Sequence, residues 1–349
     1  MPDPIPVAIT SPLEADLVGR LRDAFPGRVE IRHDPELVPA PHFPADHTGG
    51  PAWRRSPDQE RRWRDLLRPA IVTWDLATLG EAGPLDLSPG LRWVQTTSAG
   101  VGRRVRALGL DRSDVIVTTA SGIHAVPLAE WTFAALLSHV KRFRYLEDER
   151  RARRWQRHCG ESLAGMTLGI VGPGRIGREV ARLGRAFSMR VHAVARHDGP
   201  GRAAELGVDR VFPPGGLREM LASCDALVLA MPHTDETDGM IGAIELAALR
   251  PGAMLVNIAR GAVIDEAALI AALGSGHLGF AALDVTAIEP LPSDSPLWGF
   301  PNVLISPHSA STVGAENGLL TDRFIANLEL FLADRAGEMT PRLDMTRLY

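Results

Sequence analysis

The chain has 349 residues but only two cysteines, Cys159 and Cys224, and neither lies in a CxxC or Cys/His arrangement. A disulfide framework needs more cysteines, and a structural zinc site needs closely spaced ligands. These absences argue against both. We therefore expect a reduced protein without a metal site, in keeping with a cytoplasmic location.

A strong net charge and long apolar runs are also missing. The formal net charge at pH 7 is −4, which gives no overall attraction to nucleic acid or to an anionic membrane. No apolar run approaches the roughly 20 residues that a membrane-spanning helix requires. The first residues, MPDPIPVAITSPLEADL, lack the basic and apolar regions of a signal peptide. We expect neither nucleic acid nor a membrane as a partner.

The chain does contain short apolar runs that alternate with helix-length segments. Most of these runs are continuously apolar, as in parallel strands that helices cover on both faces. The pattern predicts an α/β fold built from βαβ units, and its two series of runs indicate two domains. The predicted strands are 6–10, 29–33, 70–74, 92–97 and 115–120, followed by 167–172, 190–195, 226–231, 253–258, 279–285 and 302–307.

Two segments do not follow this alternation. In 125–158, Pro127 suits a helix start and the chain is apolar as far as Phe143, so we predict one long helix at the domain boundary. The basic residues of 150–157 lie beside acidic ones, which favours a solvated helix face or a dimer arm. Segment 38–59 is rich in Pro, Gly and His and is predicted to be a long loop, either functional or a mere insertion.

The stretch TLGIVGPGRIG places Gly172, Gly174 and Gly177 directly after a predicted strand and before a helical pattern. In that context Gly172 permits a tight turn, Gly174 lets the backbone approach a pyrophosphate, and Gly177 lets the helix pack on the strand. The helix N-terminus, which begins with Arg175 and Ile176, then faces the phosphates. The sequence therefore predicts a dinucleotide site formed by these five residues.

The next strand ends in VHAVARHDG, where such proteins usually have an acidic residue that binds the ribose. Here the position is Ala195, so repulsion of a 2′-phosphate is absent, and Arg196 can donate to that phosphate, with His197 assisting. We expect NADP(H) to be favoured over NAD(H). The alternative is that Arg196 is solvated or stacks on adenine while NAD(H) is used.

Three polar residues follow the last predicted strands: Arg260 in NIARGAV, Glu289 in TAIEPLP and His308 in SPHSAS. Ligands of open α/β sheets bind beyond the carboxyl ends of the strands. An arginine can bind a carboxylate or polarise a carbonyl. A histidine exchanges protons near neutral pH, and a carboxylate bonded to it stabilises the imidazolium.

With these motifs, the sequence resembles the D-isomer-specific 2-hydroxyacid dehydrogenases over nearly its whole length. GIVGPGRIGREVA, LAMPHTDETDGMI, LVNIARGAVIDEAAL, ALDVTAIEPLPSDSPLW and PNVLISPHSA follow in that family's order. The resemblance implies that Arg260 binds and activates the substrate, that Glu289 is the partner of the histidine, and that His308 is the general acid/base.

The resemblance also implies a division of the chain. Residues 121–308 would form a Rossmann-type, doubly wound cofactor domain, and 1–120 with 309–349 a smaller flavodoxin-like substrate domain. Such proteins are usually homodimers that pair through the cofactor domains. Further residues would then contact ligands: Ser98, Ala99 and Gly100 the substrate carboxylate, Asp284 the nicotinamide carboxamide, and Pro232, Thr234 and Ile258 the cofactor.

Some positions depart from the family's pattern: Gly102, Arg103 and Arg104 follow the substrate loop, Ser311 replaces a glycine, and His233 replaces an aliphatic residue. Arg103 and Arg104 are either surface charges or a site for a second negative group.

The implied activity is NAD(P)H-dependent reduction of a small 2-keto acid, such as glyoxylate or hydroxypyruvate, to a D-2-hydroxy acid. The hydride comes from the nicotinamide and the proton from His308. The alternative is a cofactor-sensing, corepressor-like binding protein on the same fold.

Overall fold

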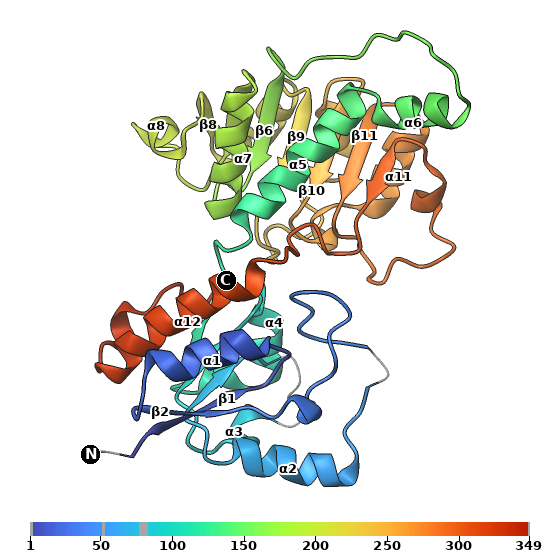
Figure 1. The fold of residues 1–349 in the computed structure, drawn as a ribbon. Coiled ribbons are helices and arrows are strands. Elements are labelled where there is room, and N and C mark those ends of the chain that lie inside the picture. Colours follow the sequence, from blue (N-terminus) through green and yellow to red (C-terminus); the bar gives the residue numbers. More distant parts are fainter. Residues whose placement is uncertain (1–2, 51–52, 77–82, 348–349) are drawn as a thin grey trace. The chain divides into compact units, whose positions relative to one another are not determined.

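The computed structural model describes residues 3–50, 53–76 and 83–347, so that residues 51 and 52 of the predicted 38–59 loop lie outside it. The chain forms two compact units (Figure 1). The first unit consists of residues 1–123 and 312–349, and the second of residues 124–311. Each unit contains one parallel sheet.

The second unit contains a seven-stranded sheet of order β12-β11-β10-β9-β6-β7-β8, in which every pairing is parallel. The order reverses between β6 and β9, which is the switch point at which doubly wound sheets bind ligands. This confirms the predicted Rossmann-type fold. The strands are β6 (Thr167–Val171), β7 (Arg190–Val194), β8 (Arg210–Phe212), β9 (Ala226–Leu229), β10 (Ala253–Asn257), β11 (Leu278–Leu283) and β12 (Val303–Ile305).

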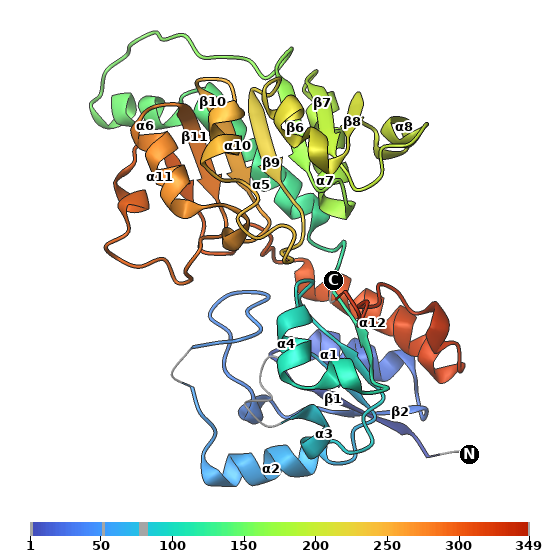
Figure 2. The same cartoon turned by 180° about the vertical axis from the view of Figure 1, so that it is seen from behind.

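Helices cover both faces of this sheet. The helices α5 (Ala125–Val140) and α7 (Arg175–Ala186) lie on one face (Figure 1), and α10 (Ala243–Ala248) and α11 (Glu266–Gly274) on the other (Figure 2). In β9, Ala226 and Val228 belong to the apolar core under α5 and α7, whereas Leu227 and Leu229 belong to the core on the opposite face. Both sides of the strand are therefore buried, which explains its continuous apolar sequence.

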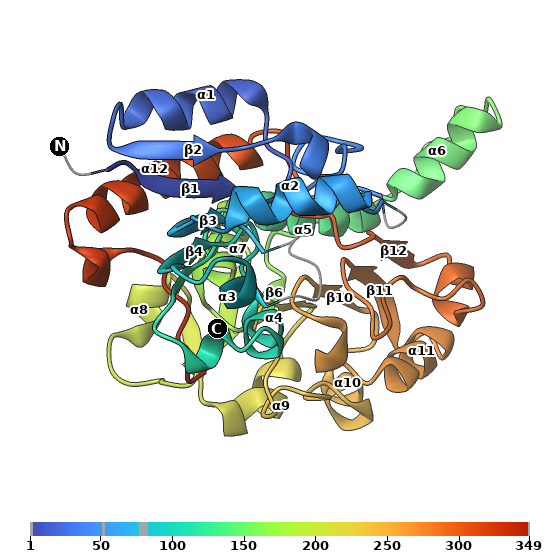
Figure 3. The ribbon, with the colours of Figure 1, turned by 90° about the horizontal axis from the view of Figure 1, so that it is seen from below.

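The first unit contains a five-stranded parallel sheet of order β2-β1-β3-β4-β5, the flavodoxin-like order. Its apolar cores lie on both faces: α1 and α12 cover one, and α2, α3 and α4 cover the other (Figures 1 and 3). The strands are β1 (Ile5–Ile9), β2 (Val29–Arg32), β3 (Val72–Trp74), β4 (Trp93–Gln95) and β5 (Ile116–Thr118). The helices are α1 (Ala15–Ala24), α2 (Pro57–Leu67), α3 (Pro84–Leu87), α4 (Gly102–Ala107) and α12 (Glu316–Leu332).

The remaining elements are short. They are α6 (Phe143–Arg151), α8 (Arg202–Leu206), α9 (Leu217–Leu221), and the 3₁₀ helices η1 (Pro35–Leu37), η2 (Leu110–Arg112), η3 (Pro214–Gly216), η4 (Gly261–Val263), η5 (Pro296–Gly299) and η6 (Ala336–Glu338). Within the described residues no helix has the length and apolarity to cross a membrane. The same residues include no group of three or more His, Cys, Asp or Glu side chains placed to bind a metal ion.

The predicted long helix at the domain boundary is α5, which begins at Ala125 but ends three residues before Phe143. Helix α5 ends at Val140, because the returning chain donates Glu161 N–H to the Val140 carbonyl at 2.8 Å. A helix continuing past this point would need that carbonyl for its own ladder. Arg142 adopts the left-handed conformation with φ 58°, and α6 starts in a new direction.

Two further elements differ from the prediction. Strand β8 is absent from the predicted set, because it has three residues, lies at the sheet edge and begins with an exposed arginine. The end of the predicted 38–59 loop is helical, since α2 begins at Pro57. Ser56 and Gln59 form a capping box there, with the Ser56 hydroxyl accepting from Gln59 N–H and the Gln59 side chain accepting from Ser56 N–H.

Candidate active site

The glycine turn after β6 leaves room only for glycine at two of its three positions. A Cβ on Gly172, whose φ is 89°, would lie 2.6 Å from the backbone of Met231. A Cβ on Gly177 would lie 2.4 Å from the Gly172 carbonyl oxygen. Around Gly174, which caps α7, a Cβ would meet nothing within 4 Å. The turn therefore presents open space at the N-terminus of α7, where a pyrophosphate can approach the backbone.

Arg175 and Ile176 open α7, with Arg175 exposed and Ile176 partly buried against the core. They stand at the end of the helix where backbone N–H groups lack intrahelical acceptors. The residues of the turn and of this helix end thus fit a dinucleotide.

Beyond β7, Ala195 is buried whereas Arg196 and His197 are exposed. The Arg196 guanidinium contacts the Glu236 carboxylate, with Nη2 and Oε2 3.5 Å apart. Glu236 lies in the segment after β9, and it is not among the residues predicted from sequence, since nothing in TDETDG marks this acid as a partner of a residue 40 positions earlier.

The segment after β9 also contains Pro232 and Thr234. The Thr237 hydroxyl donates to the Pro232 carbonyl at 2.8 Å and accepts from Thr234 N–H at 2.8 Å. Because Met231 lies against Gly172, this compact turn borders the glycine turn. Ile258, also predicted to contact the cofactor, is only 5% exposed and its side chain belongs to the apolar core.

The side chain of Asn257 fixes the turn that carries Arg260. Its Nδ2 donates to the Arg260 carbonyl at 3.0 Å, and its Oδ1 accepts from Ala259 N–H at 3.0 Å. Asn257 is 1% exposed, so both bonds lie inside the protein. Arg260 itself is partly exposed, and its Nη1 donates to the Ala259 carbonyl at 2.7 Å.

Gly261 brings the Arg260 turn against the segment that carries Glu289. A Cβ on Gly261 would lie 1.9 Å from the Thr286 carbonyl oxygen, so no other residue fits without movement of the backbone. Thr286 N–H in turn donates to Glu289 Oε1 at 3.2 Å. The close approach joins two motifs that are separate in the sequence, and no sequence signal beyond the glycine itself indicates it.

The other oxygen of Glu289, Oε2, lies 2.8 Å from Nδ1 of His308. The two side chains are 39% and 45% exposed, respectively, so a ligand can reach the pair. With Nδ1 engaged by the carboxylate, Nε2 is the ring nitrogen that faces a ligand, and the arrangement suits proton transfer.

Asp284 determines the backbone of the turn that carries His308. Its Oδ1 accepts from Ser309 N–H at 2.9 Å and from Ala310 N–H at 2.8 Å, and its carbonyl accepts from His308 N–H at 2.9 Å. These bonds support the left-handed conformation of His308, whose φ is 52°. Asp284 is 4% exposed, and among the described residues no hydrogen bond reaches its second oxygen, Oδ2.

The predicted carboxylate-binding residues belong to the first unit and lie between β4 and α4. Ser98 and Gly100 are exposed and Ala99 is partly buried. The Ser98 carbonyl accepts from the Thr96 hydroxyl at 2.7 Å and from Ala120 N–H at 3.3 Å, which orients the loop.

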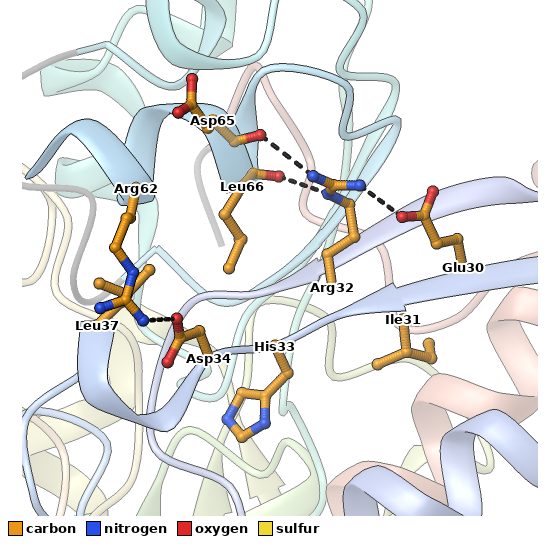
Figure 4. A pocket seen from close by; sticks show the side chains of 9 residues that line it. All are labelled: Glu30, Ile31, Arg32, His33, Asp34, Leu37, Arg62, Asp65 and Leu66. Atoms are coloured by element: carbon orange, nitrogen blue, oxygen red, sulfur yellow. Dashed lines mark hydrogen bonds and ion pairs between the residues drawn. The ribbon is translucent and has the colours of Figure 1, made fainter. Parts of the chain in front are cut away.

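A separate cavity of about 390 Å³ lies between β2, η1 and α2 of the first unit (Figure 4). Its charged lining residues pair with each other, Arg62 with Asp34 and Arg32 with Glu30. None of the residues predicted from sequence lines it, and we assign it no role in the site.

Residues 133–310 match the family model described as D-isomer specific 2-hydroxyacid dehydrogenase, NAD binding domain. The chain is similar to the D-3-phosphoglycerate dehydrogenase of Mycobacterium tuberculosis, with 35% identity over 83% of this chain and 53% of that protein. It is also similar to the glyoxylate reductase of Thermococcus gammatolerans, with 36% identity over 68% of this chain and 74% of that protein.

Among solved structures, the chain resembles a D-isomer specific 2-hydroxyacid dehydrogenase from Xanthobacter autotrophicus Py2 in complex with NADPH and MES. The TM-score is 0.75 at 26% identity, covering 99% of this chain and 100% of that one. The chain spans about half the length of the mycobacterial dehydrogenase that it matches. Together with the glycine turn and the Arg260, Glu289 and His308 motifs, these matches show that the chain belongs to the D-isomer-specific 2-hydroxyacid dehydrogenase family.

Proposed function

We propose that the protein is an NAD(P)H-dependent reductase that converts a small 2-keto acid, such as glyoxylate or hydroxypyruvate, into the D-2-hydroxy acid. The observation that carries this proposal is the exposed pair of His308 and Glu289 on a sheet whose glycine turn fits a dinucleotide. The similarity to a glyoxylate reductase over two thirds of the chain supports the small substrate.

In this proposal His308 gives the proton from Nε2 to the oxygen that develops negative charge when the carbonyl is reduced. Glu289 stabilises the imidazolium form and fixes the ring through Nδ1. Arg260 binds the substrate and polarises its carbonyl. The bound nicotinamide supplies the hydride. The backbone N–H groups of Ser98, Ala99 and Gly100 bind the substrate carboxylate.

We further propose that NADP(H) is favoured over NAD(H). The buried Ala195 offers no carboxylate to the adenosine ribose, and the exposed Arg196 offers a guanidinium to a 2′-phosphate. The relative from X. autotrophicus contains NADPH. Asp284 Oδ2 is proposed to accept from the nicotinamide carboxamide, and Pro232, Thr234 and Ile258 to border the cofactor.

The second unit would then be the cofactor domain and the first the substrate domain.

We also propose a homodimer formed by the segment from Phe143 to Cys159, which projects from the second unit (Figure 3). Phe143 is 54% exposed, Leu146 is 41% exposed and Trp155 is fully exposed, so a second copy would bury apolar surface there. Trp155→Ala should shift the molar mass in light scattering towards the monomer. An unchanged dimer would contradict the assigned surface.

The activity is tested by following nicotinamide absorbance with glyoxylate, hydroxypyruvate and pyruvate, each with NADPH and with NADH. His308→Ala should abolish turnover while cofactor binding remains. A matched control is His277→Ala, because His277 precedes β11 and its Nε2 contacts the Leu246 carbonyl instead of a strand's carboxyl end. Comparable turnover in the His308 variant would refute the proposed acid.

A further inference from the structure

We propose that Asp75 of the first unit selects 2-keto acids whose side chain carries a hydroxyl or ammonium group, and rejects those with a second negative group. This inference rests on the proposed reductase function and names its substrate class. It concerns a residue that no motif in the sequence marks.

Asp75 lies at the carboxyl end of a central strand in the sheet of the first unit, where a ligand is expected. It directly follows β3, whose last residue, Trp74, pairs with Ile9 of β1 and with Gln95 of β4. The carboxyl ends of these parallel strands therefore meet around Asp75, and such ends form the ligand side of open α/β sheets. The 98–100 loop, the proposed binding site of the substrate carboxylate, begins three residues after β4 at the same edge.

The Asp75 carboxylate is buried without adequate partners. Asp75 is 5% exposed, and its Oδ2 has no hydrogen-bond partner among the described residues. Its Oδ1 accepts only a long bond of 3.5 Å from Thr97 N–H. Ser11, which lies just beyond β1, is fully buried, and within the described part of the chain its Oγ is likewise unpartnered.

Asp75 differs from the buried Asp46, both of whose carboxylate oxygens accept from backbone N–H groups, those of His42, Thr48 and Gly49. Asp284 accepts two short backbone N–H bonds through its Oδ1. Burying a carboxylate oxygen without a donor is costly, and most such oxygens in native proteins have one. The missing donor at Asp75 Oδ2 points to a ligand.

The backbone holds Asp75 in place independently of its side chain. Its N–H donates to the Gln95 carbonyl at 2.6 Å, and the Thr10 hydroxyl donates to its carbonyl at 2.7 Å. Its φ of 70° is left-handed, a conformation that aspartate tolerates better than most residues. The backbone of Asp75 is therefore held by Thr10, just beyond β1, and by Gln95 of β4, and no protein donor is needed to orient its carboxylate.

A carboxylate at this position accepts hydrogen bonds from a hydroxyl or ammonium group and repels a carboxylate or phosphate. A site that must satisfy a buried acceptor discriminates strongly against an analogue that lacks the donor. The nearby Arg104 donates from Nη2 to the Leu76 carbonyl at 2.6 Å. The chemistry at Asp75 thus favours a hydroxylated keto acid over a phosphorylated one, although the chain is similar to a D-3-phosphoglycerate dehydrogenase.

The test compares kcat/KM for four keto acids: glyoxylate, which has no side chain, hydroxypyruvate, pyruvate and oxaloacetate. The wild type should prefer hydroxypyruvate to pyruvate by at least about tenfold. Asp75→Ala removes the acceptor and should reduce that ratio by at least about tenfold. Asp75→Asn keeps an acceptor but removes the charge, and should raise oxaloacetate relative to glyoxylate by about tenfold or more.

Asp111→Asn is the matched control. Asp111 lies on η2, which precedes β5, so it is at the opposite end of the strands from Asp75. This variant should leave the kcat/KM ratios among the four keto acids unchanged. Thermal unfolding checks that each variant is folded. Unchanged ratios in both Asp75 variants, with glyoxylate still reduced, would overturn the selectivity and leave the reductase intact. A wild type that reduces no keto acid would overturn both.

Discussion

Nδ1 of His308 lies 2.8 Å from Oε2 of Glu289, and Oε1 of the same glutamate accepts from Thr286 N–H. Both carboxylate oxygens are thus engaged, and the ring can place only Nε2 towards a substrate. In the proposed reduction this nitrogen gives the proton, and Glu289 holds the ring in place through Nδ1.

Glu289→Gln removes the charge of the carboxylate while keeping the size of the side chain. We expect kcat/KM for reduction to fall by at least about tenfold while cofactor affinity persists, because a neutral amide holds His308 Nδ1 less strongly than a carboxylate does. The measurement is kcat/KM for reduction, with the cofactor dissociation constant, in both proteins. An unchanged kcat/KM would contradict the proposed role of Glu289.

Arg196 and Glu236 should act oppositely on cofactor choice. Arg196→Ala should weaken NADPH binding about tenfold or more through loss of a charge-assisted bond, with little effect on NADH. Glu236→Gln should strengthen NADPH binding, because the Arg196 guanidinium is then no longer shared with a carboxylate. The gain should be at most about fivefold, because an exposed ion pair contributes little free energy. Dissociation constants from titration calorimetry check both. Equal effects on NADPH and NADH would show that Arg196 and Glu236 do not distinguish the 2′-phosphate.

Gly261→Ala should uncouple Arg260 from the Glu289 segment. A Cβ 1.9 Å from the Thr286 carbonyl forces that backbone apart, so kcat should fall at least about tenfold, as misplacement of catalytic groups by 1 Å can cost more. Gly314→Ala is the control, because a Cβ there meets nothing within 4 Å. Cofactor affinity should persist in both variants, and an unchanged kcat in Gly261→Ala would contradict the proposed coupling.

Asp46 should make the stability of the first unit depend on pH. Burial opposes its ionisation, but hydrogen bonds from the backbone of His42, Gly49 and Thr48 and from the His42 side chain outweigh it, and they lower its pKa from 3.8 to about 2. A lowered carboxyl pKa stabilises the fold above the unfolded-state value and loses that effect as the pH falls towards 2.

Asp46→Asn should therefore lower the free energy of unfolding by about 2 kcal/mol at pH 7 and by much less near pH 2. Urea unfolding at several pH values measures the difference. A difference that stays constant with pH would show that the amide disrupts packing and that the charge is irrelevant. The bonds around Asp46 also show that this part of the 38–59 segment is an ordered turn.

The sequence alone determined the fold class, the glycine turn and the three catalytic candidates, because each depends on local pattern. Continuous apolar runs report burial on two faces, and Gly172, Gly174 and Gly177 mark a turn within one βαβ unit. The positions of Arg260, Glu289 and His308 follow from where strands end.

Only the tertiary structure decided which distant groups meet. Three contacts join segments that follow different strands: Gly261 with Thr286, Arg196 with Glu236, and Asp284 with the His308 turn. The tertiary structure also shows that the buried carboxylate of Asp75 has an oxygen without a partner among the described residues. The break after Val140 likewise depends on Glu161, which returns to the carbonyl from 21 residues away. Hydrogen bonding and steric exclusion act through space, so a pattern read along the chain cannot locate their partners.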